Sequence, residues 1–188
     1  MKLVAVLNRI ENSKEIDNYY LAAIKKFGGI PLLIDETNLE LLKFCRGVLL
    51  TGGDTKGSLD DYLIKYALDN KLPLLGICQG MQSMALYGTN NNLVDVDDHY
   101  RVNHYINLND SRLKKIVEKD RILVNSYHHS KVTSSKVFDI VAYSEDGVVE
   151  AVENKNHPFQ IGVEWHPERM IDSLSSIRIF EEFIKSII

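Results

Sequence analysis

Short runs of apolar residues alternate with longer amphipathic segments along the first half of the chain. The runs that have the length of buried strands cover residues 3–7, 30–34, 47–50 and 72–77. Between them, apolar side chains recur at helical spacing, which predicts helices over 16–27, 39–44 and 59–68. Strands that are joined by helical crossovers form a parallel sheet with helices on both faces. The first half therefore predicts an α/β fold.

The second half begins after Gly88 and follows a different pattern. Apolar and polar residues alternate over 102–108 and over parts of 138–144 and 148–152, which is typical of antiparallel strands with one face in water. Asp146-Gly147 predicts a hairpin turn between the last two. We expect another strand over 159–163 and a final helix over 171–188, whose apolar face carries Leu174, Ile177, Phe180, Ile184 and Ile187. The predicted fold is one α/β domain over 1–188, a mostly parallel open sheet with an antiparallel extension.

Composition and charge argue against several classes of function. The chain has 188 residues, and 22 Lys and Arg against 26 Asp and Glu give a formal charge of -4. Because the basic residues are scattered, we expect neither nucleic acid nor a membrane surface as partner. The apolar runs are far shorter than the roughly 20 residues that span a bilayer, and residues 1–7 resemble a first strand more than a signal peptide. With only Cys45 and Cys78 present, we expect no disulfide framework and a cytoplasmic setting.

Cys78 follows the fourth apolar strand, inside Gly76-Ile77-Cys78-Gln79-Gly80 and before a helical run. A cysteine on a glycine-flanked turn from strand to helix is held near a helix N-terminus, whose partial positive charge favours the thiolate. A lone cysteine is more often a small buried side chain, and that is the interpretation for Cys45. For Cys78 the pattern favours a nucleophile, provided that a base lies elsewhere in the chain.

A base and an orienting acid follow another strand, in Gly162-Val163-Glu164-Trp165-His166-Pro167-Glu168. His166 would transfer the proton, and Glu168, two residues on, would fix the imidazole tautomer. Taken alone, His-Pro-Glu is more often a surface loop. Together with the turn at Cys78, it predicts a Cys-His-Glu triad.

Paired glycines follow the third strand, in Thr51-Gly52-Gly53-Asp54. They could simply form a turn. The functional interpretation is an oxyanion hole, in which a backbone N–H of Gly52 or Gly53 acts with the N–H of Gln79 on a tetrahedral intermediate.

Five ordered motifs cover nearly the whole chain. They lie at 51–54, 76–82, 125–129 (Asn-Ser-Tyr-His-His), 146–151 (Asp-Gly-Val-Val-Glu-Ala) and 162–168. In this order the set resembles class I glutamine amidotransferase-like proteins, and more closely their γ-glutamyl hydrolase branch, the peptidase C26 family. Residues 20–24 and 28–31 are also similar to that branch. The resemblance implies a flavodoxin-like sheet flanked by helices.

The resemblance also assigns roles to residues. It makes Cys78 the nucleophile, His166 the acid and base, and Glu168 the orienting carboxylate. Gln82 and the segment Ser126, Tyr127, His128 and His129 would hold the α-amino and α-carboxylate groups of a γ-glutamyl moiety; without the family, the His pair would be polar loop residues. Arg9 would meet an acidic group on the leaving portion, or would be a solvated loop residue.

No cofactor and no metal ion is expected. Asp95, Asp97, Asp98 and His99 have the composition of a metal cluster, but their spacing matches no ligand template, so the prediction is a solvated loop and no metal ligands.

The implied activity is hydrolysis of a γ-glutamyl amide in a small conjugate, either a γ-glutamyl amine or a γ-glutamyl nucleotide phosphoramidate, through a thioester. One alternative is a glutaminase subunit that delivers ammonia to a separate synthase, and another is a catalytically silent binding protein. Residues 90–100 replace a longer connection of the family, and Ser130 stands where many relatives have Gln, which leaves the leaving group undefined. The sequence leaves the oligomeric state open, a homo-oligomer included.

Overall fold

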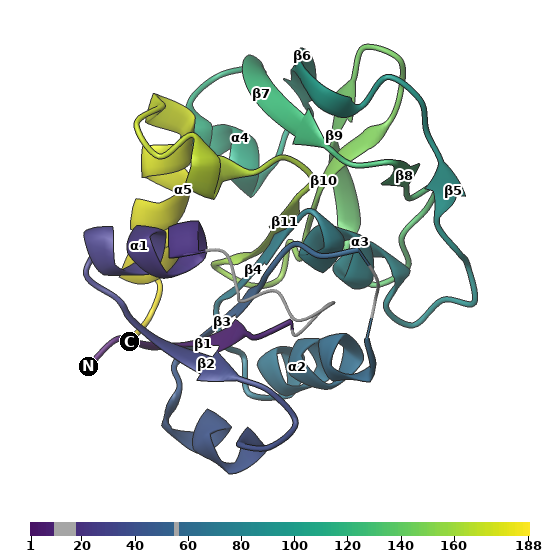
Figure 1. Ribbon diagram of the computed structural model, residues 1–188. Helices are drawn as coiled ribbons and strands as arrows, with labels where there is room; N and C mark the ends of the chain where they lie inside the picture. Colours follow the sequence, from purple (N-terminus) through teal and green to yellow (C-terminus); the bar gives the residue numbers. More distant parts are fainter. Residues whose placement is uncertain (10–17, 55–56) are drawn as a thin grey trace.

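A nine-stranded mixed sheet runs through the computed structural model, which describes residues 1–9, 18–54 and 57–188 (Figure 1). The strand order is β2-β1-β3-β4-β11-β10-β9-β6-β7. Neighbours from β2 to β11 are parallel, and neighbours from β11 to β7 are antiparallel. The predicted mostly parallel sheet with an antiparallel extension is thus confirmed.

The parallel half consists of short, buried strands. They are β1 (Leu3–Leu7), β2 (Ile30–Ile34), β3 (Gly47–Leu50), β4 (Leu74–Ile77) and β11 (Gln160–Val163). All residues of β3, β4 and β11 are buried, because helices cover both faces of the sheet at its centre. The predicted strands agree with these bounds within two residues; β4 begins after Pro73, which has no N–H to give to a central ladder.

The antiparallel half contains four longer strands and a small separate ribbon. The strands are β6 (Tyr100–Leu108), β7 (Arg121–Tyr127), β9 (Asp139–Ser144) and β10 (Val149–Glu153), and the ribbon pairs β5 (Val94–Asp95) with β8 (Ser130–Lys131). The predicted hairpin joins β9 and β10, with Gly147 at a φ of 83° in its turn.

Helices form a layer on each side of the sheet (Figure 1). One core contains buried residues of α1 (Asn18–Lys26), α4 (Arg112–Val117) and α5 (Leu174–Lys185). The other contains residues of α2 (Ser58–Asp69), α3 (Gln79–Leu86) and the 3-10 helix η1 (Leu39–Phe44). Successive residues of β1 face opposite layers, Val4 and Val6 one core and Ala5 and Leu7 the other. The predicted helix over 16–27 is found from Asn18 onward, and its first two residues lie outside the described residues.

The buried face of α5 agrees only in part with the predicted one. Ile179, Phe183 and Ile184 are buried, whereas Leu174 is 52% exposed and Ile177 is only partly buried. The prediction was wrong at Leu174, the first residue of the helix, and only partly right at Ile177, whereas Phe180, Ile184 and Ile187 are buried as predicted.

The six-residue helix α4 was not predicted, and its support comes from elsewhere in the chain. Ser111 caps it by accepting the N–H of Lys114 at 3.0 Å. The carboxylate of Glu153, on β10, accepts the N–H groups of Arg112 at 3.1 Å and Leu113 at 3.0 Å. A helix this short is marginal by local propensity, so this tertiary cap at its N-terminus stabilises it.

Three glycines allow α3 to lie directly against the centre of the sheet. A Cβ atom on Gly80 would lie 2.4 Å from the carbonyl oxygen of Leu50, and one on Gly76 would lie 2.6 Å from Met84 Sδ. A Cβ on Gly162 would lie 2.9 Å from the side chain of Met81. The backbone of α3 therefore lies too close to β3, β4 and β11 for side chains at these positions.

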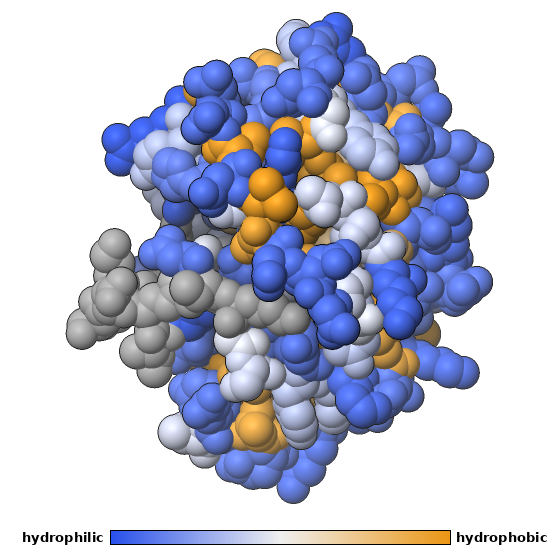
Figure 2. All heavy atoms as spheres, turned by 90° about the vertical axis from the view of Figure 1, so that its right-hand side faces the viewer, coloured by the Kyte–Doolittle hydropathy of each residue, from blue (hydrophilic) through white to orange (hydrophobic). Residues whose placement is uncertain are grey.

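Hydrophilic residues cover most of the face seen in Figure 2, and hydrophobic residues gather in its upper half. Within the described residues, no helix is long and apolar enough to cross a membrane.

Gly80→Ala should lower the free energy of unfolding by about 1 to 3 kcal/mol, because the added methyl group meets backbone atoms that cannot rotate away. The midpoint of urea unfolding measures this change. Gly57→Ala is the matched control, since its Cβ would have no atom closer than 3.7 Å. A Gly80→Ala variant as stable as the wild type would contradict the close approach.

Candidate active site

Four parallel strands end at the same edge of the sheet, and the segments that follow them carry the predicted functional residues. Arg9 follows β1, Gly52 and Gly53 follow β3, Cys78 follows β4, and His166 follows β11. Since β1, β3, β4 and β11 are consecutive in the sheet, the topology brings these segments together.

Cys78 occupies a sharp turn between β4 and α3. Its φ of 51° and ψ of -110° lie in a region that side-chain-bearing residues rarely adopt. The turn is held on both sides: the N–H of Cys78 donates to the carbonyl of Val163 at 2.8 Å, and its carbonyl accepts the N–H of Gln82 at 3.0 Å. The side chain is 7% exposed. The strained turn therefore fixes the direction of the Sγ atom without closing it off entirely.

The thiol form of Cys78 is favoured in the resting molecule. Burial raises its pKa well above the ordinary value, and the nearby carboxylates of Glu164 and Glu168 raise it further. The N–H of Gln79 and the charge of Arg9 act in the opposite direction without overcoming burial. The expected preference for thiolate at this helix N-terminus is thus outweighed by desolvation.

His166 and Glu168 form a buried pair on the segment after β11. His166 Nδ1 lies 2.6 Å from Glu168 Oε1, and the two side chains are 7% and 0% exposed. A carboxylate can only accept, so Nδ1 carries the hydrogen and Nε2 is left with the lone pair. Pro167–Arg169 forms the short 3-10 helix η2, whose turn brings the two side chains together.

Asn125, on β7, holds the backbone of His166. Its side-chain amide donates to the His166 carbonyl at 3.0 Å, and its carbonyl accepts the His166 N–H at 2.8 Å. In the sheet, β10, β9 and β6 lie between β7 and β11. This contact therefore requires the antiparallel half to curl back toward the carboxyl edge of the parallel strands.

Side chains of Tyr20, His166 and Cys78 lie close around Gly52. A Cβ atom there would lie 2.8 Å from the Tyr20 hydroxyl, 3.1 Å from His166 Cε1 and 3.6 Å from Cys78 Cβ. The N–H of Gly52 donates to the Tyr20 hydroxyl at 3.0 Å. Of the two glycines proposed for an oxyanion hole, Gly52 thus already has an acceptor, and the N–H of Gly53 is the better candidate beside that of Gln79.

Gln82 lies one turn into α3 with its amide group buried. Its Nε2 donates to Glu164 Oε1 at 2.5 Å and to the carbonyl of Ser130 at 3.0 Å. Both amide hydrogens are therefore used within the protein, and only the Oε1 acceptor suits the predicted contact, with a substrate ammonium group. Burial and the charge of Glu150 raise the pKa of Glu164 well above its usual range.

The predicted clamp at 126–129 alternates in direction. Ser126 and His128 point inward: the Ser126 hydroxyl donates to the carbonyl of His99 at 2.5 Å, and the His128 N–H donates to the same oxygen at 3.1 Å. Tyr127 and His129 are exposed. The ring of Tyr127 packs edge-on near His166, with centroids 5.8 Å apart, whereas His129 stacks on Tyr100. Within the segment, the ring of Tyr127 thus packs against His166.

Arg9 is not a solvated loop residue. Its guanidinium binds the Asp60 carboxylate through two contacts, at 2.9 and 2.5 Å, and its Nε donates to the Thr51 carbonyl at 3.2 Å. The side chains of Arg9 and Asp60 are 9% and 1% exposed. Its role in meeting an acidic leaving group stays a prediction, in which the guanidinium would keep its pairing with Asp60.

The acidic loop behaves as expected, apart from its last residue. Asp95, Asp97 and Asp98 are exposed, and Asp95 pairs with Ser130 in the β5–β8 ribbon. His99, in contrast, is 3% exposed.

Sequence analysis gave no separate role to Tyr20, Asn125 and Glu164, although all three lie within the quoted motifs. The clearest signal was Glu164, a carboxylate that directly follows the all-apolar strand β11 and is 1% exposed. A buried acid at the end of a central strand needs a specific partner, which in this case is Gln82.

The fold is that of class I glutamine amidotransferase-like proteins. A crystal structure of a glutamine amidotransferase from Methylobacillus flagellatus superposes with a TM-score of 0.77 at 13% identity, over 100% of this chain and 95% of that one. The glutaminase domain of Trypanosoma brucei CTPS with bound acivicin has a TM-score of 0.74 at 14% identity, over 100% and 96%.

Residues 54–168 match the family model of peptidase C26, and the chain belongs to this family. It is 28% identical to the γ-glutamyl-γ-aminobutyrate hydrolase PuuD of Escherichia coli strain K12, over 97% of this chain and 91% of that protein. The resemblance to the γ-glutamyl hydrolase branch is thus confirmed. These relationships support a hydrolase that acts on carbon–nitrogen bonds.

The raised pKa of Cys78 predicts slow alkylation at neutral pH. In Cys45→Ser protein, the rate of carboxamidomethylation of Cys78 by iodoacetamide should rise about tenfold per pH unit from about pH 6 to about pH 9, because the thiolate fraction grows with pH below the pKa. Mass spectrometry of the quenched protein gives the rate. A plateau already reached below about pH 7 would contradict the prediction, since it would indicate a preformed thiolate.

Proposed function

We propose that this protein is a cysteine hydrolase that cleaves the γ-glutamyl amide bond of a small γ-glutamyl conjugate and releases L-glutamate. The observation that carries the proposal is the strained turn at Cys78 beside the buried His166–Glu168 pair. Membership in peptidase C26 and the similarity to a γ-glutamyl-γ-aminobutyrate hydrolase support the γ-glutamyl group as the fixed part of the substrate.

In the first half-reaction, Cys78 Sγ attacks the γ-carbonyl carbon while its proton passes to His166 Nε2. A concerted transfer suits a resting thiol, because no buried thiolate has to exist before the substrate is bound. The N–H groups of Gln79 and Gly53 stabilise the oxyanion. The C–N bond then breaks, and His166 returns the proton to the departing nitrogen.

In the second half-reaction, water attacks the γ-glutamyl thioester and His166 accepts its proton. The C–S bond breaks, glutamate leaves, and the proton returns to Cys78. Glu168 keeps the Nδ1 hydrogen of His166 in place throughout. The Oε1 atom of Gln82 accepts from the α-ammonium group of the substrate.

A panel of γ-glutamyl compounds tests the function directly. It contains γ-glutamyl amines, a γ-glutamyl nucleotide phosphoramidate and free glutamine, with the matching acetyl and succinyl amides as controls, and enzymatic glutamate detection as the readout. The proposal expects glutamate release from at least one conjugate at a much higher kcat/KM than from glutamine. Preference for free glutamine, with stimulation by a partner chain, would favour a glutaminase subunit instead; cleavage of all amides at equal rates would rule out γ-glutamyl recognition.

Cys78→Ser should lower kcat by about a thousandfold or more, because the nucleophile is lost. Cys45→Ser should stay within about twofold of the wild type, since Cys45 is a buried core residue under η1. Steady-state rates on the best substrate of the panel give the comparison. Normal turnover by Cys78→Ser, together with an inactive Cys45→Ser, would contradict the assignment of Cys78 as the nucleophile.

His166→Ala should lower the rate of γ-glutamyl amine hydrolysis by about 100 to 10,000-fold, and Glu168→Gln by less, because Glu168 only orients the ring. The leaving group of γ-glutamyl-p-nitroanilide depends less on a proton. With this substrate, Cys78 of the His166→Ala variant should be acylated, and the resulting thioester should accumulate because its hydrolysis is slow. Intact-protein mass spectrometry detects that adduct. If Glu168→Gln is folded and loses more of the rate than His166→Ala on both substrates, the carboxylate and not the imidazole transfers the proton.

A further inference from the structure

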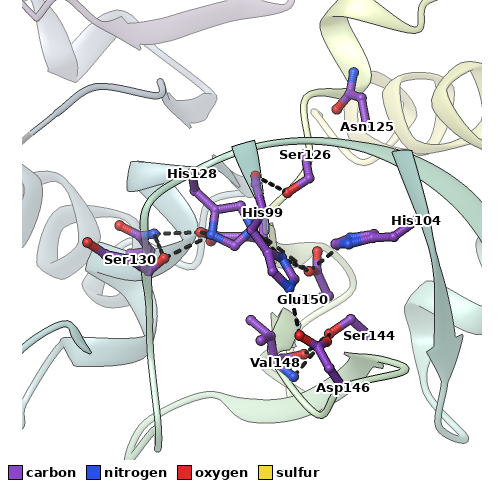
Figure 3. A network of polar contacts seen from close by, with 12 residues as sticks. His99, His104, Asn125, Ser126, His128, Ser130, Ser144, Asp146, Val148 and Glu150 are labelled. Atoms are coloured by element: carbon purple, nitrogen blue, oxygen red, sulfur yellow. Dashed lines mark hydrogen bonds and ion pairs between the residues drawn. The ribbon is translucent and has the colours of Figure 1, made fainter. Parts of the chain in front are cut away.

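A second cluster of buried titratable groups lies in the antiparallel half (Figure 3). His99 precedes β6, His128 follows β7, and Glu150 belongs to β10. Their exposed fractions are 3%, 4% and 0%. His99 Nδ1 lies 3.2 Å from His128 Nε2, and Glu150 Oε1 lies 3.7 Å from the first nitrogen and 3.9 Å from the second. Three potential ligand atoms from three separate segments thus converge on one point.

The outer nitrogens of both rings identify their tautomers. His99 Nε2 lies 2.9 Å from Asp146 Oδ2, and His128 Nδ1 lies 2.9 Å from the carbonyl of Ser130. Both partners are acceptors, so each outer nitrogen carries a hydrogen and, in a neutral ring, each inner nitrogen carries a lone pair. In the neutral rings, two lone pairs therefore face each other beside a carboxylate.

Glu150 adds an independent sign of a missing partner. Neither of its carboxylate oxygens has a hydrogen-bond partner among the described residues, although both are buried. His104 Nε2, the nearest charged contact, lies 3.1 Å from Oε1. A fully buried carboxylate with one imidazole as its nearest polar neighbour leaves Oε2 without a donor, and such a group is costly unless a cation balances it.

The size of the triangle suits a small divalent ion. In the plane of its three atoms, the equidistant point lies about 2.1 Å from each, the length of Zn–N and Zn–O bonds; an ion displaced from this plane toward a fourth ligand keeps that bond length when the three side chains move slightly closer together. Two imidazoles and one carboxylate are also a donor set that zinc accepts, with one position left for water.

We propose that His99, His128 and Glu150 form a Zn²⁺ site that ties together β6, β7 and β10. Each ligand has an outer partner of the kind that orients metal ligands: Asp146 and the Ser130 carbonyl hold the two imidazoles, and His104 lies against Glu150. Ser144 in turn hydrogen-bonds Asp146 Oδ1. The site is distinct from Cys78 and His166, and it does not depend on the proposed hydrolase activity.

Metal binding is measured in Cys78→Ser protein, so that the thiol cannot compete for zinc. After removal of metal by a chelator, the protein is titrated with Zn²⁺ against a chromogenic chelator and, separately, with Co²⁺, whose visible absorption reports the coordination. We expect one Zn²⁺ per chain, a four- or five-coordinate Co²⁺ spectrum, and a higher Tm with zinc than without it.

Variants locate the ion without touching the proposed triad. Asp146→Asn should weaken zinc affinity by about 10 to 100-fold, as is typical for loss of an outer carboxylate, and Glu150→Gln should weaken it at least as much. The matched controls are Glu145→Gln, a neighbour of Asp146 that pairs with Arg121, and His129→Asn, an exposed neighbour of His128. Both should bind zinc like the parent protein.

Two results would overturn the proposal. One is a folded parent protein that binds no stoichiometric zinc. The other is unchanged zinc affinity in both Asp146→Asn and Glu150→Gln, which would place the ion elsewhere. Near-UV circular dichroism of each variant confirms that it is folded before affinities are compared.

Discussion

The close approach of α3 to the sheet is the constraint on which the rest of the site depends. Gly76, Gly80 and Gly162 leave no room for side chains between this helix and the three central strands. With the helix so near, the chain must reverse direction within a single residue, and Cys78 takes the positive φ that this reversal requires. Its sulfur is consequently directed at the strand ends, where the neighbouring strands β3 and β11 deliver Gly52 and His166.

The same packing determines the electrostatics. A site at the buried centre of a sheet desolvates every charge, which raises the pKa values of Cys78, Tyr20 and Glu164 together. The polar groups are therefore held in pairs whose hydrogen bonds replace water: His166 with Glu168, Arg9 with Asp60, and Gln82 with Glu164. Reactivity in such a site depends on where protons are placed more than on free charge.

Local patterns in the sequence predicted the parallel half well, because buried strands and amphipathic helices there follow simple periodicities. They did not predict α4, which depends on Glu153 from a distant strand. They also did not predict β7, which is stabilised by its pairing with β6. Motif order identified the segments that meet at the strand ends. It could not reveal that Arg9 pairs with Asp60, since that contact joins the segment after β1 to the first turn of α2, far apart in the chain. The convergence of His99, His128 and Glu150 likewise depends on three strands being in register.

The hydrogen bonds between Asn125 and the His166 backbone connect the two ends of the antiparallel half of the sheet. This half runs from β11 through β10, β9 and β6 to β7, and Asn125 on β7 binds the segment that directly follows β11. Every one of these strands must be paired before the imidazole acquires its fixed position. Partly folded chains would thus have a cysteine turn but no anchored base. Under the proposed mechanism, catalytic competence would therefore depend on the assembled sheet, and a partly folded chain would lack the activity.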